Sequence, residues 1–433
     1  MRRLTAILLW SVIAAAFIGP GTVTTAAAAG AGFGLALLWT LVFSTVACLV
    51  LQEASARLTL VSGRNLGQAL RHRYPAGFTG TAVLLLVLGA IVLGCAAYEA
   101  GNILGGVAGA VLATGRSPKL LALASGVIAG LLLWFNKPRR VAHLLSIVVA
   151  VMGVAFLFTA WQLRPELGEI LRGALMPSLP TGSALLAIGL VGTTVVPYNI
   201  FLGSGIAGGQ SLGELRLGLA VAVGLGGLIS MGVLVAGTAV DGAFSFQALS
   251  LVLAERLGPW AASLFAIGLF GAGISSAITA PLAAAVTARS LFQTADNEER
   301  WSERSWRYRS VWLAVLLTGL GFGLSDVAPI PAIVLAQALN GVLLPIVAIF
   351  LLLEVNDRRS MGEREVNGLF SNGVMTLVVA VTVLLGTANL ARAVARTLGW
   401  SAPTHGTLLV ISAVVVILVS VPVYRAWERR RRP

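Results

Sequence analysis

The feature that most constrains this chain is a series of long apolar runs without Asp, Glu, Lys or Arg. Residues 120–135, 141–159 and 408–421 are examples. Uninterrupted runs of this kind predict transmembrane helices, because a helix with one face in water shows an amphipathic period instead. Only 11% of the 433 residues are charged, whereas about a quarter is usual in soluble proteins. The sequence therefore predicts an all-α multi-pass membrane protein.

The apolar runs predict about twelve transmembrane helices. The predicted spans are residues 4–34, 36–60, 80–112, 120–135, 141–161, 183–210, 215–239, 259–291, 310–324, 328–353, 370–396 and 405–426. The segment 244–256 is too short and too polar to span, so we expect it at the outer surface. No linker divides the chain, and we predict one transmembrane domain over residues 1–433.

The net charge of +13 would suggest nucleic acid in a soluble protein, but here the basic residues lie in short loops between apolar runs. The positive-inside rule places such residues in the cytoplasm. They gather in the predicted inner loops 64–73, 137–140, 296–309 and 354–365 and in the tail 429–432. We therefore predict a cell (inner) membrane protein with both termini in the cytoplasm and no nucleic-acid partner. The sequence has no nucleotide-binding or catalytic motif, so we predict neither an enzyme nor a cofactor.

Two predicted spans are interrupted in the middle. Residues 18–25 read Ile-Gly-Pro-Gly-Thr-Val-Thr-Thr, and residues 192–199 read Gly-Thr-Thr-Val-Val-Pro-Tyr-Asn. Pro and Gly break helices, and unwound backbone within a bilayer must line a cavity or be buried in protein. A single proline kink is a structural alternative, but breaks five spans apart are typical of inverted-repeat transporters with a midplane substrate site. The repeats would cover residues 4–161 and 183–353, followed by extra helices over 370–426.

Several motifs resemble those of one known family. Residues 19–34 align without gaps with a first-helix segment that begins Asp-Pro-Gly-Asn, and residues 196–199 fall on a Met-Pro-His-Asn motif. Further matches are residues 63–66, 336–337 and 357–362. On these motifs the chain resembles the natural resistance-associated macrophage protein (NRAMP) family of divalent-metal transporters. The resemblance implies an inverted five-plus-five helix repeat (LeuT-like) with discontinuous helices 1 and 6, and metal ion transport by a secondary transporter.

The family's metal ligands are replaced in this chain. Its metal-binding Asp is Gly19, its Asn is Thr22, its Met is Val196 and its His is Tyr198. At an effective dielectric constant of about 20, the loss of one carboxylate at about 4 Å forfeits roughly 4 kcal/mol of attraction, or about a thousandfold in affinity. We therefore do not expect the usual Mn²⁺ or Fe²⁺ selectivity.

One acid lies deep within an apolar span. The family's acidic pair in the third span corresponds to Ala96 and Glu99, so only Glu99 remains. Carboxylates within a membrane are costly and usually functional, and the resemblance places Glu99 on a proton pathway; a structural hydrogen bond is the alternative. Glu53 and Arg57, at positions i and i+4 near the inner end of the second span, predict a structural ion pair.

The predicted site offers hydroxyl, amide and backbone oxygens. The predicted substrate-binding residues are Gly19, Gly21, Thr22, Thr25, Thr193, Val196, Tyr198 and Gln337. Only Thr22 and Gln337 are candidate metal ligands. Alternatively, the Gly-Pro-Gly-Thr start of a half-helix could bind the carboxylate of a small organic or amino-acid-like solute. The expected partners are thus a divalent cation or small solute, H⁺ and the lipid bilayer.

Overall fold

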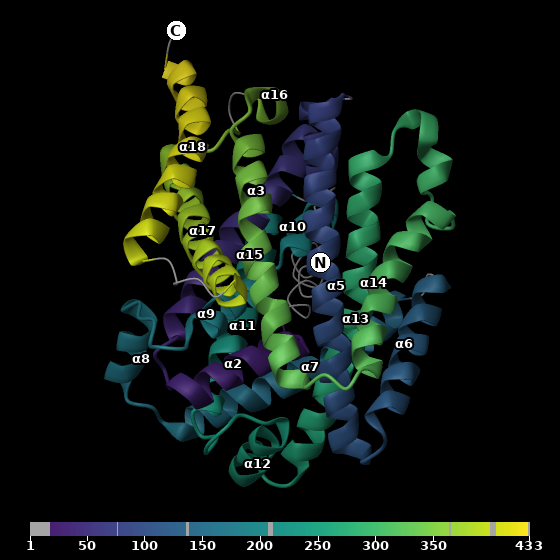
Figure 1. Ribbon diagram of the computed structural model, residues 1–433, viewed down its shortest axis with the longest axis vertical. Helices are drawn as coiled ribbons and strands as arrows, with labels where there is room; N and C mark the ends of the chain where they lie inside the picture. The colour runs from purple at the N-terminus through teal and green to yellow at the C-terminus, as the bar shows by residue number, and fades with distance from the viewer. Residues whose placement is uncertain are drawn as a thin grey trace.

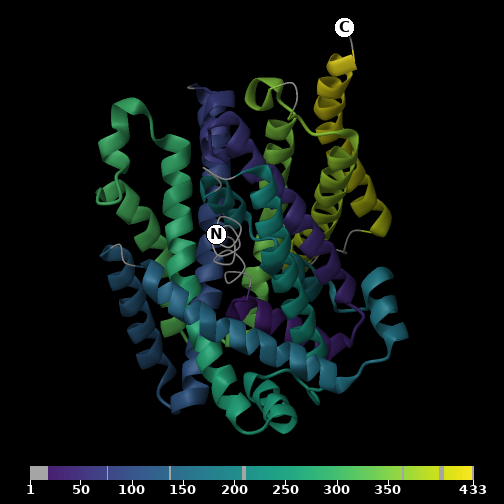
Figure 2. The ribbon, with the colours of Figure 1, turned by 180° about the vertical axis from the view of Figure 1, so that it is seen from behind.

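The computed structural model describes residues 18–75, 77–135, 138–206, 211–362, 365–398 and 404–431. This part of the chain is almost entirely helical (Figure 1 and Figure 2). Eight of its helices are long and apolar enough to cross a membrane, and 118–134 and 406–418 are shorter apolar helices. The predicted all-α multi-pass architecture is confirmed. Residues 4–17 of the first predicted span lie outside the described residues.

The helices follow the predicted spans closely. In chain order they are α2 (Pro20–Phe33), α3 (Leu38–Ser62), α4 (Leu66–Arg73), α5 (Phe78–Thr114), α6 (Pro118–Trp134), α7 (Pro138–Leu163), α8 (Leu167–Leu175), α9 (Ala184–Thr194), α10 (Pro197–Ile206), α11 (Leu212–Gly237), α12 (Phe246–Leu257), α13 (Trp260–Phe292), the 3₁₀ helix η1 (Ala295–Trp301), α14 (Trp306–Leu324), α15 (Pro329–Val355), α16 (Arg358–Met361), α17 (Leu369–Leu398) and α18 (His405–Arg431).

The centre of the bundle is built on close contacts between long helices. Helix α5, with 37 residues, packs along α13, α14 and α15. Gly106 of α5 faces Gly273 of α13, where a Cβ on either glycine would press against the backbone of the other helix. Small residues let membrane helices approach in this way and so gain van der Waals contact.

The second helix break is narrower than predicted. We expected unwinding over residues 192–197, but α9 stays helical through Thr194 and α10 begins at Pro197. Only Val195 and Val196 lie between the two helices. Gly192 does not break the helix because it packs flush against the backbone of α15, where a Cβ would overlap the carbonyl of Gln337. Pro197 ends the gap because its ring suits the first position of a new helix.

Helix α2 begins at the first predicted break. Gly19 is extended (φ −87°, ψ 174°), Pro20 is the first helical residue, and no side chain caps the helix. Gly21 and Thr22 are therefore wound, in contrast to the broader break that their sequence suggests. The first backbone bond of the helix runs from the Val23 N–H to the Gly19 carbonyl at 3.2 Å.

The two ends of the bundle carry different elements. Helices α8 and α12 lie at one end, and α16 and the C-terminus lie at the other (Figure 1). The predicted surface segment 244–256 is thus mostly the short helix α12. Helix α8 was not predicted; its exposed Leu167, Leu171 and Leu175 recur on one face.

Candidate substrate site

A hydroxyl pair joins the two broken helices. Thr22 of α2 and Thr193 of α9 are both buried, and their Oγ1 atoms lie 2.8 Å apart. Thr24 behaves differently, because its hydroxyl donates to the Pro20 carbonyl of its own helix at 2.7 Å. Thr24 therefore stabilises only its own helix, whereas Thr22 and Thr193 form a contact between the two helices.

Gln337 of α15 covers the start of α2. Its side chain is fully buried, and neither Nε2 nor Oε1 has a hydrogen-bond partner among the described residues. The amide lies directly over Gly21, where a Cβ would overlap it. Thr25 also lies nearby, because both it and Gln337 border Gly189 of α9. A Cβ on Gly189 would lie 3.1 Å from the Thr25 methyl carbon and 3.7 Å from the Gln337 Cβ. The structure therefore brings Gly21, Thr22, Thr25, Thr193 and Gln337 together.

Two tyrosines form an aromatic wall beside this group. Tyr98 of α5 and Tyr198 of α10 are buried and pack edge to face, with ring centroids 5.6 Å apart. Tyr98 lies beside Thr193, which connects the wall to the hydroxyl pair. Sequence reasoning included Tyr198 but missed Tyr98, although a polar aromatic residue directly before Glu99 in an apolar span was a usable signal.

Buried polar atoms without a partner gather around the two breaks. Such atoms occur on Thr25, Tyr98, Tyr198, Asn199, Gln337 and Asn340. Native proteins leave few buried polar groups unpaired, because each costs about 1–3 kcal/mol. Among the described residues such atoms also occur elsewhere, for example on Thr159, Ser276 and Thr287. Those of Thr25 and Gln337 lie together beside the start of α2, where water or a polar substrate could complete their hydrogen bonds.

The remaining predicted residues have different surroundings. Gly19 contributes only extended backbone at the start of α2, and the Val196 side chain belongs to an apolar cluster with Tyr98 and Tyr198. In the described part of the chain, no three His, Cys, Asp or Glu residues are close enough to hold a metal ion. Within this part, neutral oxygens supply the only ligands that the helix breaks offer to a cation.

Glu99 lies on another face of α5, turned toward α14. It is fully buried and packs against Gly319, where a Cβ would press on its Cγ and its carbonyl oxygen. Asn102 Nδ2 donates to Oε2 at 3.3 Å, whereas Oε1 has no partner in the part of the chain that the structure describes. The structure therefore does not place Glu99 in contact with Thr22 or Gln337.

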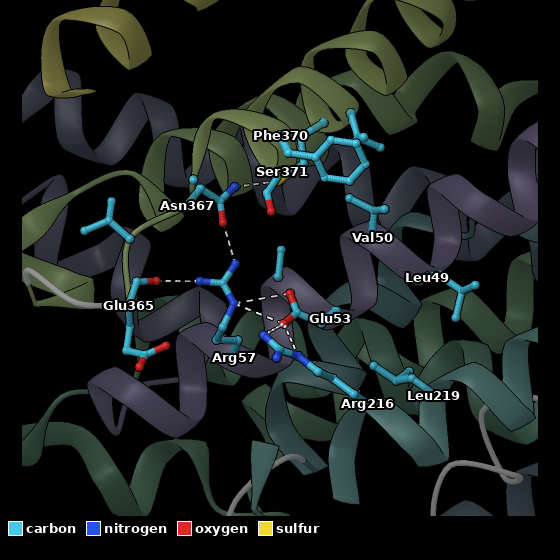
Figure 3. Close-up of a pocket in the computed structure, with 15 residues that line it drawn as sticks. Leu49, Val50, Glu53, Arg57, Arg216, Leu219, Glu365, Asn367, Phe370 and Ser371 are labelled. Atoms are coloured by element: carbon cyan, nitrogen blue, oxygen red, sulfur yellow. Dashed lines mark hydrogen bonds and ion pairs between the residues drawn. The ribbon is translucent and has the colours of Figure 1, made fainter. Parts of the chain in front are cut away.

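A second polar cluster lines a cavity of about 390 Å³ between α3, α11 and the start of α17 (Figure 3). The Glu53 carboxylate accepts from Arg57 at 3.2 Å and from Arg216 at 2.9 Å. Arg57 also donates to the Glu365 carbonyl at 2.6 Å and to Asn367 Oδ1. The predicted pair of Glu53 and Arg57 is confirmed, and its third member, Arg216, was not predicted.

Known structures share this arrangement of helices. A manganese transporter of Eremococcus coleocola superposes with a TM-score of 0.71 at 20% identity, over 99% of this chain and 95% of that chain. The nucleobase-cation-symport-1 family transporter MHP1 superposes with a TM-score of 0.58 at 18% identity, over 97% and 92% of the two chains. The fold is therefore the LeuT-like inverted repeat with discontinuous helices.

Sequence relatives agree with the fold. A divalent metal cation transporter MntH of Aeromonas hydrophila is 28% identical over 398 residues, which cover 86% of this chain and 92% of the relative. The corresponding protein of Deinococcus radiodurans is 30% identical over 303 residues, 65% of this chain and 68% of the relative. The family model described as natural resistance-associated macrophage protein-like matches residues 11–392. With most of its length matched and the discontinuous helices in place, the chain belongs to the NRAMP family of membrane transporters.

Proposed function

We propose that this chain is a proton-linked secondary transporter that binds a divalent cation where α2, α9, α10 and α15 meet. The observation that carries the proposal is the Gln337 amide, which is fully buried over the start of α2 and has no hydrogen-bond partner on either atom among the described residues. Curated relatives are named divalent metal cation transporters. The unpartnered Gln337 amide and the similarity to these relatives together favour a cation as the substrate.

The chemistry of the site favours weak and unselective binding. Thr22, Thr193 and Gln337 provide neutral oxygens. Gly19 and Val196 stand where the family has an Asp carboxylate and a Met thioether, so the site has neither of these ligands. Hard cations accept oxygen ligands, whereas a thioether selects softer transition metals. We therefore expect a partly hydrated cation, bound with little preference for Mn²⁺ over Mg²⁺ or Ca²⁺.

A calorimetric titration of the purified protein tests this proposal. We expect Mn²⁺, Mg²⁺ and Ca²⁺ to bind with similar affinities, and Thr22→Val to weaken each about tenfold, because one hydroxyl ligand is worth about 1.4 kcal/mol. Thr24→Val is the matched control, since that hydroxyl bonds within its own helix. Low-micromolar binding of Mn²⁺ alone would contradict the altered selectivity.

A small organic carboxylate is the second candidate substrate. It is favoured by the start of α2, where extended Gly19 leaves the helix without a side-chain cap. The positive end of a helix dipole attracts anions. Thermal stabilisation of the protein by acetate or an amino acid, with none from the three cations, would support this candidate and exclude the cation.

We also propose the membrane and the orientation. Arg64, Arg71 and Arg73 follow α3, while Arg358 and Arg359 lie in α16 at the end of the bundle that carries the C-terminus (Figure 1). The positive-inside rule supports a cytoplasmic position for this end in an inner membrane. Residues 4–161, 183–353 and 370–426 would then be two repeats and two extra helices of one domain.

A further inference from the structure

A second cavity, of about 620 Å³, lies where α6 and α13 end and α14 begins. Three arginines line it: Arg289 near the end of α13, Arg304 just before α14 and Arg309 in the first turn of α14. The connection between α13 and α14 lies at the same end of the bundle as α16 (Figure 1). The residues that line the cavity include none of those at the helix breaks, and the cavity lies at the end to which we assign the cytoplasm.

The lining of this cavity contains more arginines than acidic residues. Arg289 pairs with Glu303 at 3.5 Å, and no described acid pairs with Arg304 or Arg309. The Arg309 guanidinium lies over the Trp134 ring at 3.9 Å. Stacking on an aromatic face holds a guanidinium in place while its N–H groups at the edge stay available to an anion. The cavity therefore presents preorganised donors with an excess of positive charge.

Leu133, Trp134 and Phe135, at the end of α6, also line this cavity. The small residues of this helix face inward, and Gly126 packs against Leu320 of α14. Its outward side chains include Leu131, 52% exposed, and Trp134, 45% exposed, and Phe135 follows at 65%. Aromatic side chains are enriched at the level of lipid headgroups. An anion bound by the arginines could thus carry acyl chains that lie along α6.

We propose that this cavity binds the phosphate headgroup of an anionic phospholipid from the cytoplasmic leaflet. Arg304 and Arg309 donate to the phosphate, and the acyl chains lie on the apolar face that includes Leu131. Basic pockets between transmembrane helices on the cytoplasmic side suit such headgroups. Continuity with a lipid-facing surface distinguishes this occupant from free phosphate, which would gain nothing from the exposed side chains of α6.

Lipid binding to the purified full chain tests the proposal. Phosphatidylglycerol, phosphatidylcholine and inorganic phosphate are each titrated against the protein in neutral detergent, with the unfolding temperature and native mass spectrometry as readouts. We expect phosphatidylglycerol alone to bind and stabilise. The double variant Arg304→Gln/Arg309→Gln should bind it roughly 30-fold more weakly, from about 1 kcal/mol for each arginine.

The matched control is Arg256→Gln on α12, an exposed arginine at the opposite end of the bundle, which should leave lipid binding unchanged. Should the double variant unfold, the single variant Arg304→Gln replaces it, because Arg304 is exposed and is not needed for packing. Equal binding by wild type and variant, or equal stabilisation by phosphate alone, would overturn the proposal.

Discussion

Two polar regions of this molecule differ in how their buried groups are satisfied. In the cluster of Figure 3, Arg57 is only 6% exposed, yet it has partners in Glu53, Glu365 and Asn367. At the helix breaks, both amide atoms of the equally buried Gln337 have none. Arg57 and Gln337 are both buried polar side chains, so burial alone does not distinguish them. The difference teaches that a buried charged group in this fold is held by completed pairing, whereas the neutral Gln337 amide beside the helix break keeps its hydrogen-bonding capacity for another group.

The largest effect should come from breaking the completed cluster. Arg57→Ala removes the bonds to Asn367 and the Glu365 carbonyl and should lower the free energy of unfolding by about 3 kcal/mol, since a broken buried ion pair leaves uncompensated polar groups. Equilibrium unfolding in denaturing detergent measures it. Arg216→Ala is the matched control, because Arg216 is 59% exposed and should cost less than about 1 kcal/mol. Equal losses in the two variants would abolish the proposed distinction.

The second prediction concerns Gly21→Ala at the helix break, which should reduce transport while the protein remains folded. Gly21→Ala places a methyl group where the Gln337 amide lies. This amide is the end of a flexible side chain and can turn aside, so the protein should fold while cation uptake into proteoliposomes falls about tenfold, from one lost ligand. Gly32→Ala in the same helix, with open space around it, should transport normally. Full uptake by Gly21→Ala would show that Gln337 does not touch the substrate.

The smallest effect on stability is expected at Glu99. Glu99→Gln keeps the side-chain volume and can still accept from Asn102, so unfolding should change by less than about 1 kcal/mol. Uptake should lose its pH dependence, because an amide cannot carry the proton. The control is Glu255→Gln on the exposed surface of α12. An unchanged pH profile in Glu99→Gln would show that Glu99, like Arg57, has only a structural role.

The sequence predicted the fold and the positions of the breaks, because Pro and Gly leave strong local signals in apolar runs. It did not predict their width, since Gly192 and Gly21 serve close packing on α15 rather than unwinding. It also missed Tyr98 and the direction of Glu99. In α5 nearly all faces are apolar, so no period shows which way a side chain points. The ion pair of Glu53 and Arg216 joins residues that are far apart in the sequence, so no local sequence pattern could predict it.

The hydroxyl pair of Thr22 and Thr193 has a consequence for turnover. The pair connects a helix of the first half of the chain with a helix of the second half, and a neutral hydrogen bond of this kind contributes about 1 kcal/mol net. A solute oxygen that replaces either hydroxyl would compensate for most of the loss. If the proposed substrate binds at this pair, it would favour separation of the two halves in the loaded protein over the empty one by about fivefold.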